Sequence, residues 1–148
     1  MNTMTTDHPL TQEEFDSIYA KVPRLTVEII IKNNKGEVYL TKRNIEPCKG
    51  LWHLPGGTVR FGEPLTDAVK RIAHRELGIE VIKEKMIGYI EYPSHYLNGM
   101  DSPVGIAFQV TDFDGVFTIN EEAGESGWFD ELPTPMHDEQ VAFLNVLS

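Results

Sequence analysis

Cysteine, basic charge and long apolar runs are all scarce in this sequence. Cys48 is the single cysteine, so no disulfide can form within the chain, and an unpaired thiol is typical of a reducing compartment. No apolar run approaches the roughly 20 residues that span a bilayer, and residues 1–9 contain no apolar signal core. We therefore expect a cytoplasmic protein without a membrane partner, in which Cys48 is a spare thiol in a polar loop.

The charge balance is strongly acidic, with 13 basic and 23 acidic side chains and a formal net charge of −10. Binding to a nucleic-acid backbone needs a basic surface, so we do not expect nucleic acid as a partner. A small phosphorylated ligand is still compatible, because charges are screened beyond roughly 8 Å at physiological salt. A bound divalent cation is one way to make a local site positive in an acidic protein.

The chain length of 148 residues fits one main domain. We expect an N-terminal segment over residues 1–23 and a domain over residues 24–148. The first segment is predicted to contain one helix, Thr11–Val22, which a capping box begins and a proline ends.

Short strands alternate with helices in the rest of the sequence. Leu25–Lys32 is predicted to be a strand with Leu25, Val27, Ile29 and Ile31 on one face and Thr26, Glu28, Ile30 and Lys32 on the other. Val38–Arg43 follows an Asn-Asn-Lys-Gly turn, which predicts a β-hairpin. A helix is predicted at Pro64–Leu77, with Gly78 at its C-terminal end. Further elements are expected as strands at 51–54, 81–91, 104–111, 117–119 and 126–129 and as a helix at 136–147. This mixed order predicts an α/β sandwich rather than a regular βαβ repeat.

The most informative stretch is Gly56–Ile79. Leu65, Val69 and Ile72 share one face of the predicted helix, and Glu76 continues that apolar stripe. A carboxylate on a buried stripe is costly unless it is paired or bound to a metal. The alternative is that Glu76 reaches solvent at the helix end, and periodicity alone leaves this open.

Spacing adds a stronger signal. The series Gly57, Glu63, Arg71, Glu76 and Gly78 resembles the Nudix box, in which a glycine, a glutamate, an arginine, further glutamates and a final glycine recur at fixed distances. The flanking segments resemble the family too, and the resemblance extends over about residues 24–133. It implies an α/β/α sandwich with a mixed sheet and the box helix at its centre. It also implies a metal-dependent hydrolase of the MutT-like type, acting on a nucleoside diphosphate linked to another group.

Two positions depart from the full box. Ile72 and Arg75 stand where the family has glutamates. In lacking these glutamates, the sequence resembles the GDP-mannose mannosyl hydrolases, a subgroup of the family. By that resemblance one Mg²⁺, or alternatively Mn²⁺, would be held by the carbonyl of Gly56, by Glu76 and by Glu122. Fewer carboxylates should hold fewer cations, so we expect a single tightly bound ion.

The resemblance also implies roles for four further side chains. Glu63 and Arg71 would form an ion pair that supports the loop and the metal ligands. Arg43 would bind phosphate through its guanidinium fork, the alternative being a surface arginine. Glu28 stands where the mannose subgroup has an acid that contacts the sugar, the alternative being a half-exposed strand carboxylate.

The general base is the one role that the resemblance does not match to a residue here. The mannose subgroup uses a histidine for attack on the sugar carbon, and here that position is Ala123. Glu125 is the nearest candidate, the alternative being an exposed loop acid. His95 lies in a loop with two tyrosines that could stack on a base. Without the histidine, attack of water on phosphorus is favoured.

The sequence thus predicts a Mg²⁺-dependent Nudix hydrolase of a nucleotide sugar or an ADP-ribose-like compound, and a homodimer is compatible with it. A hypothesis from another class is a degenerate Nudix domain that binds a nucleotide or a partner without turnover. The departures at Ile72, Arg75 and Ala123 support that alternative. The loops that would read the nucleotide vary within this fold, so the sequence leaves the substrate itself open.

Overall fold

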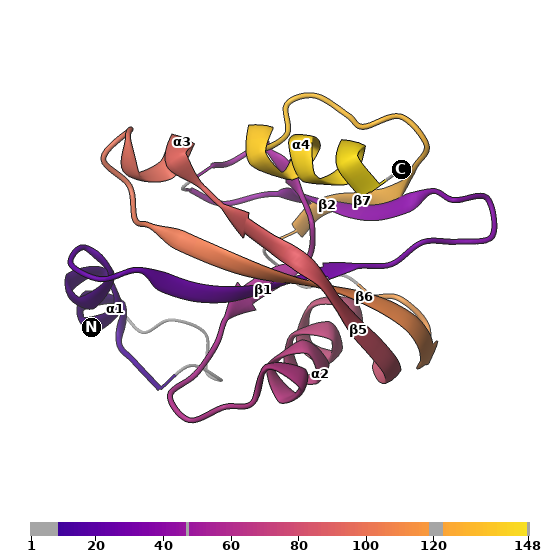
Figure 1. The fold of residues 1–148 in the computed structure, drawn as a ribbon, viewed down its shortest axis with the longest axis horizontal. Helices are drawn as coiled ribbons and strands as arrows, with labels where there is room; N and C mark the ends of the chain where they lie inside the picture. The colour runs from indigo at the N-terminus through magenta and orange to yellow at the C-terminus, as the bar shows by residue number, and fades with distance from the viewer. Residues whose placement is uncertain (1–8, 47, 119–122, 148) are drawn as a thin grey trace.

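The computed structural model describes residues 9–46, 48–118 and 123–147, and within these the chain folds into two sheets with helices packed outside them (Figure 1). The elements in chain order are α1 (Gln12–Tyr19), β1 (Arg24–Ile30), β2 (Val38–Arg43), β3 (Trp52–His53), β4 (Gly56–Thr58), α2 (Leu65–Leu77), β5 (Glu80–Glu91), α3 (Pro93–Tyr96), β6 (Pro103–Asp114), β7 (Ala123–Phe129) and α4 (Asp138–Leu147).

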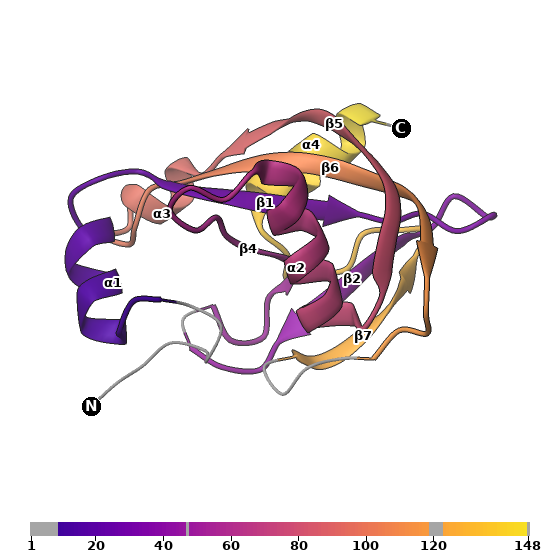
Figure 2. The same ribbon diagram turned by 90° about the horizontal axis from the view of Figure 1, so that it is seen from below.

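The larger sheet is mixed. Its strand order is β4-β1-β6-β5, with β1 parallel to β6 and the other pairings antiparallel, while the smaller sheet has the order β3-β2-β7. The box helix α2 packs on one side of the larger sheet against β1, β4 and β5 (Figure 2). Helix α4 lies on the opposite side (Figure 1). The predicted α/β sandwich with a mixed sheet is therefore confirmed. Among the described residues, no helix is long and apolar enough to cross a membrane.

The predicted hairpin is only partly correct. The turn forms as expected, with Gly36 at φ 78° and its N–H donating to the Asn33 carbonyl at 3.0 Å. Strands β1 and β2 then separate into different sheets and keep only marginal contacts, such as the bridge between Lys32 and Val38. The reason is that β4 and β6 occupy both edges of β1, and these partners lie far away in the sequence.

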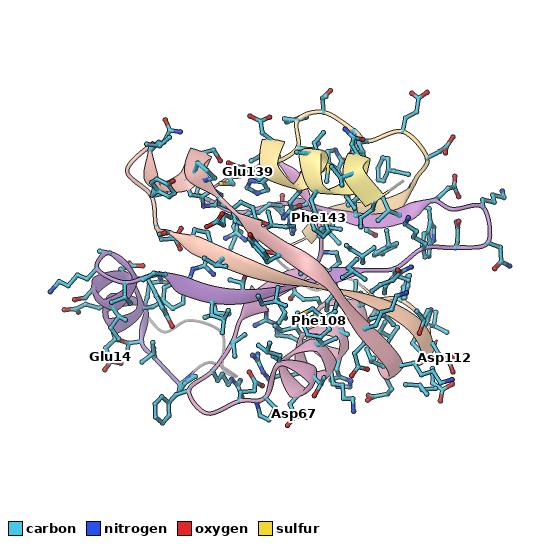
Figure 3. All side chains as sticks on the ribbon, in the orientation of Figure 1. Glu14, Asp67, Phe108, Asp112, Glu139 and Phe143 are labelled. Atoms are coloured by element: carbon cyan, nitrogen blue, oxygen red, sulfur yellow. The ribbon has the colours of Figure 1, made fainter. Side chains whose placement is uncertain are left out.

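The alternation of β1 places apolar side chains on two separate cores. Val27 and Ile29 pack toward α2, whereas Ile30 packs toward α4. Figure 3 shows Phe108 of β6 on the α2 side and Phe143 of α4 pointing toward the sheet. Burying a side chain such as Ile29 contributes about 1.5–3 kcal/mol to the stability of the fold. Because β1 has side chains in both cores, it helps to hold α2 and α4 on the sheet.

The predicted start of α1 and stop of α2 are confirmed, but α1 ends at Tyr19, before the predicted end at Val22 and Pro23. In α1 the Thr11 hydroxyl accepts from the Glu14 N–H at 3.1 Å, and the Glu14 side chain accepts from the Thr11 N–H, which completes the capping box. Helix α2 ends at Gly78 in the left-handed conformation (φ 70°), as expected. Phe117 and Thr118 are not in a strand, which departs from the predicted strand at 117–119, and Ile119 lies outside the described residues.

Candidate active site

Strand β4 meets helix α2 at the Gly56-Gly57 pair. A Cβ at Gly57 would lie 2.9 Å from the Ile72 Cδ1 atom, so the backbone packs directly on the helix. A Cβ at Gly56 would lie 2.6 Å from both the Glu28 Oε2 atom and the Val27 carbonyl oxygen. Neither position can take a larger residue without movement. Ile72 is fully buried in this contact, so the residue that replaces a box glutamate belongs to the core.

The Glu63–Arg71 ion pair is present and bidentate. Arg71 Nε donates to Glu63 Oε2 at 2.8 Å and Arg71 Nη2 donates to Glu63 Oε1 at 2.9 Å. Arg71 Nη2 also donates to the Thr58 carbonyl at 2.9 Å, and the Arg60 N–H donates to Glu63 at 3.0 Å. The hydrogen bonds from Arg71 lower the pKa of the Glu63 carboxyl. The pair therefore fixes the segment between β4 and α2 onto the helix.

Glu76 is partly buried near the C-terminal end of α2. Its side chain is 15% exposed, so it does not extend freely into solvent, and Arg75 Nε contacts its Oε2 at 3.2 Å. Arg75 Nη2 would also lie 3.5 Å from a Cβ at Gly57. The Arg75 guanidinium thus lies near both the Glu76 carboxylate and Gly57.

Arg43 ends β2 at the entrance of the loop over residues 44–50. Its N–H donates to the Leu51 carbonyl at 2.9 Å and its carbonyl accepts from the Gly50 N–H at 2.8 Å, so the loop closes on this residue. A β-bulge separates Lys42 from Arg43, and Ala123 is the register partner of Arg43 in β7. The position that carries a histidine in the mannose subgroup is therefore beside the candidate phosphate ligand.

Glu125 lies in β7, not in a loop. Its side chain is 63% exposed and forms an ion pair with Lys42 at 3.8 Å. The contact is long and solvated, so it holds Glu125 only weakly. Glu122, the third candidate metal ligand, lies outside the described residues.

Glu28 is buried, with 7% of its surface exposed, and this differs from the half-exposed alternative. The Tyr92 hydroxyl donates to its Oε1 atom at 3.0 Å and the Thr26 hydroxyl donates to the same atom at 3.2 Å. Gln140 Nε2 of α4 donates in turn to the Tyr92 hydroxyl at 2.9 Å. Burial raises the pKa of the Glu28 carboxyl to about 7.

Two glycines of neighbouring strands enclose this carboxyl group. A Cβ at Gly105 of β6 would lie 2.6 Å from Glu28 Oε1, as a Cβ at Gly56 of β4 would from Oε2. Sequence reasoning did not identify Tyr92 and Gln140 as its partners. The available signal was Gly105, because a glycine inside a strand often marks the close approach of another group.

The fold and this constellation define a class, the MutT-like hydrolases of nucleotide derivatives. The NUDIX domain matches residues 22–144, and the chain belongs to the Nudix family and is a Nudix hydrolase. The low-salt glycan biosynthesis protein Agl8 of Haloferax volcanii is 34% identical over 148 residues, which cover 95% of this chain and 94% of that protein.

Two further similarities extend this comparison. The ADP-ribose pyrophosphatase of Methanocaldococcus jannaschii is 32% identical over 109 residues, covering 73% of this chain and 62% of that protein. The crystal structure of a MutT Nudix hydrolase from Burkholderia pseudomallei superposes with a TM-score of 0.79 at 29% identity, covering 86% of this chain and 100% of that one.

Proposed function

We propose that this Nudix hydrolase is magnesium-dependent and cleaves a nucleoside diphosphate linked to a sugar, either a nucleotide sugar or an ADP-ribose-like compound. The observation that carries the proposal is the bidentate Glu63–Arg71 pair. Arg71 also donates to the Thr58 carbonyl, so the pair ties the end of β4, which contains the Gly-Gly pair, to α2, the helix that carries Glu76. This is a positioning device for a carbonyl and a carboxylate, and a purely structural module would not need it.

The donor set fits magnesium. A backbone carbonyl at Gly56, the carboxylate of Glu76 and the carboxylate expected from Glu122 are all oxygen ligands, which Mg²⁺ and Mn²⁺ prefer. Arg75 contacts Glu76, but a carboxylate has about four lone-pair sites and can serve two partners. When bound, the cation would neutralise phosphate charge and activate water.

The substrate class is supported by Arg43 and by the relatives. Arg43 ends β2 beside the first residue of β7, and its guanidinium suits the oxygens of a diphosphate. The names of two relatives refer to glycan biosynthesis and to ADP-ribose, both of which involve a nucleoside diphosphate joined to a sugar. A contact of Glu28 with the sugar and a role of Glu125 as the base stay predictions.

The proposal is tested by incubating the metal-free protein with GDP-mannose, UDP-glucose, ADP-ribose and 8-oxo-dGTP, with and without Mg²⁺. We expect hydrolysis of at least one diphosphate-linked sugar, lost on addition of EDTA and restored by Mg²⁺. A preference for the nucleoside triphosphate would contradict the substrate class. Tight nucleotide binding by calorimetry without any turnover would instead identify the chain as a binding domain.

A further inference from the structure

Three side chains with metal-binding chemistry converge on the side of the sheet opposite α2. Cys48 comes from the loop between β2 and β3, His95 from α3, and His137 from the residue before α4. One ligand atom from each, the cysteine sulfur and a ring nitrogen of each histidine, lies within 4.8 Å of the other two. These residues are far apart in the sequence, so the tertiary fold brings them together, and the proposed magnesium ligands do not include them.

His95 is oriented as a metal ligand would be. Its Nδ1 atom faces Asp101 Oδ1 at 3.4 Å, and Arg24 in turn holds the Asp101 carboxylate at 2.6 Å. Its Nε2 atom is buried and has no hydrogen-bond partner among the described residues. Metal-binding histidines commonly give one ring nitrogen to a carboxylate and the other to the ion. A buried ring nitrogen without a partner is otherwise unfavourable.

The two histidines are fixed relative to each other. Glu139 in the first turn of α4 accepts hydrogen bonds from both the backbone N–H and the hydroxyl of Ser94 at 2.8 Å, which ties α3 to α4 (Figure 3). The rings of His95 and His137 have centroids 5.3 Å apart, and both pack against Tyr92.

The third donor is held by an unusual backbone conformation. Cys48 has φ 66°, in the left-handed region that residues other than glycine rarely adopt. Its carbonyl accepts from the Leu51 N–H at 3.1 Å. Backbone outliers of this kind tend to occur at ligand sites, because the surrounding structure must compensate for the strain. Here the outlier places the thiol beside the two imidazoles.

We propose that Cys48, His95 and His137 form a binding site for Zn²⁺, separate from the magnesium site at α2. One thiolate and two neutral imidazoles are the donors that Zn²⁺ takes, whereas Mg²⁺ prefers oxygen. Zn–S and Zn–N bonds of about 2.3 and 2.0–2.1 Å require donor atoms roughly 3.3–3.7 Å apart, so the group would close by about 1 Å on binding. Three protein donors leave a fourth position open for water or an oxygen of a ligand.

The site is tested by titrating metal-free protein with ZnCl₂ against a chromophoric chelator, in excess Mg²⁺ and without nucleotide. We expect one Zn²⁺ per chain, and a sulfur-to-metal charge-transfer band when CoCl₂ replaces zinc. Cys48→Ser and His95→Gln should weaken Zn²⁺ binding by about tenfold or more. The matched control is His74→Gln, because His74 is 68% exposed on α2 and pairs with the surface Glu80. Equal zinc affinity in all variants would overturn the proposal.

A second measurement needs no substitution, so it holds even if a variant fails to fold. Cys48 is the only thiol, and its reaction with a thiol reagent reports on this site alone. Bound Zn²⁺ should slow that reaction by about tenfold or more, and Mg²⁺ should not. A rate that is the same with and without Zn²⁺ would show that the cysteine is not a ligand. Because neither assay uses turnover, their outcome is independent of the proposed hydrolase activity.

Discussion

At the scale of single residues, three glutamates with the same side chain have three different environments. Arg71 holds Glu63 in a fork and lowers the pKa of its carboxyl, so it stays ionised as a structural anchor. Glu28 is buried between strands, where burial raises the pKa of its carboxyl to about 7. Glu76 is partly buried and contacts Arg75. Such differences in environment allow chemically identical carboxyl groups to have separate roles in one fold.

Replacing Glu76 by Gln should remove most of the hydrolase activity while the fold is kept. The neutral amide is a much poorer ligand for a divalent cation than a carboxylate. We expect kcat/KM to fall by more than about 100-fold. Replacing a residue that only hydrogen-bonds to a metal ligand already lowers metal affinity or activity by about 10–100-fold. Electron paramagnetic resonance during a Mn²⁺ titration should show weaker binding at the one strong site. The control is Glu80→Gln, a 69% exposed acid just beyond the same helix, and near-normal Mn²⁺ affinity in Glu76→Gln would contradict the assignment.

Glu28 should make the stability of the protein depend on pH in a recognisable window. The pKa of its carboxyl is about 7 in the folded state against 4.5 as the ordinary value, so the folded state keeps a proton that the unfolded chain releases. Stability from this group is complete below about pH 4.5 and is lost as the pH rises through 7. The difference corresponds to about 3 kcal/mol at most.

Urea unfolding of the wild type and of Glu28→Gln at several pH values, in EDTA, checks this expectation. Between pH 4.5 and pH 8, the free energy of unfolding of the variant should increase relative to that of the wild type. A difference between the two proteins that stays constant over this range would mean that Glu28 ionises at its ordinary pKa despite its burial.

At the scale of elements, local patterns predicted what local chemistry determines. The capping box at Thr11, the stop of α2 at Gly78 and the alternation along β1 all follow from neighbours in sequence. The turn of the predicted hairpin forms, but β1 and β2 lie in different sheets because β1 pairs with β4 and β6, which no local pattern specifies. The burial of Glu28 and the proximity of His95 to His137 could not be predicted from local patterns either, because both depend on how α3 and α4 pack in the folded chain.

The segment between β4 and α2 offers a test of one such element. Its Glu63–Arg71 pair is 14% and 18% exposed and carries two parallel hydrogen bonds. A double-mutant cycle with Glu63→Gln and Arg71→Lys should give a coupling energy of about 1–3 kcal/mol, because Lys cannot reproduce the fork. Both single variants should also lose activity, since the loop that positions Gly56 would loosen.

The matched control for stability is the Lys42–Glu125 pair, which is solvated and 3.8 Å apart. Its coupling should be about 0.2–1 kcal/mol at most. Chemical denaturation of all the single and double variants supplies both values. A coupling at Glu63–Arg71 no larger than that of the surface pair would mean that the fork does not hold the loop.

At the scale of the whole molecule, α2, which carries Glu76, and the pair α3 and α4, beside which His95 and His137 lie, are on opposite sides of the larger sheet (Figure 1). The site at the end of α2 offers oxygen donors, and the cluster between α3 and α4 offers sulfur and nitrogen. Arg43 is close enough to influence the ionisation of both Cys48 and His137, so a phosphate bound there would adjoin the zinc cluster. Cations bound at both proposed sites would offset part of the net charge of −10 beside a phosphate ligand.

The last prediction concerns the bond that breaks. Attack on the sugar carbon needs a base within hydrogen-bond reach of the water on the sugar side. Ala123, beside Arg43 in register, has no such group, and Glu125 is paired with Lys42. His95 directs Nδ1 to Asp101, and its ring lies in the cysteine–histidine cluster. Attack on phosphorus requires less of the protein, because the cation supplies charge neutralisation.

We therefore expect hydrolysis in oxygen-18 water to place the label in a phosphate product, giving a nucleoside monophosphate and a sugar phosphate. Mass spectrometry of both products identifies which phosphorus was attacked, and unlabelled products incubated with the enzyme in labelled water correct for exchange. Label found only on the anomeric hydroxyl would mean attack on carbon. The base would then have to come from Glu125 released from Lys42, and Glu125→Gln should abolish that label incorporation, whereas under phosphorus attack the same substitution should leave the labelled atom unchanged.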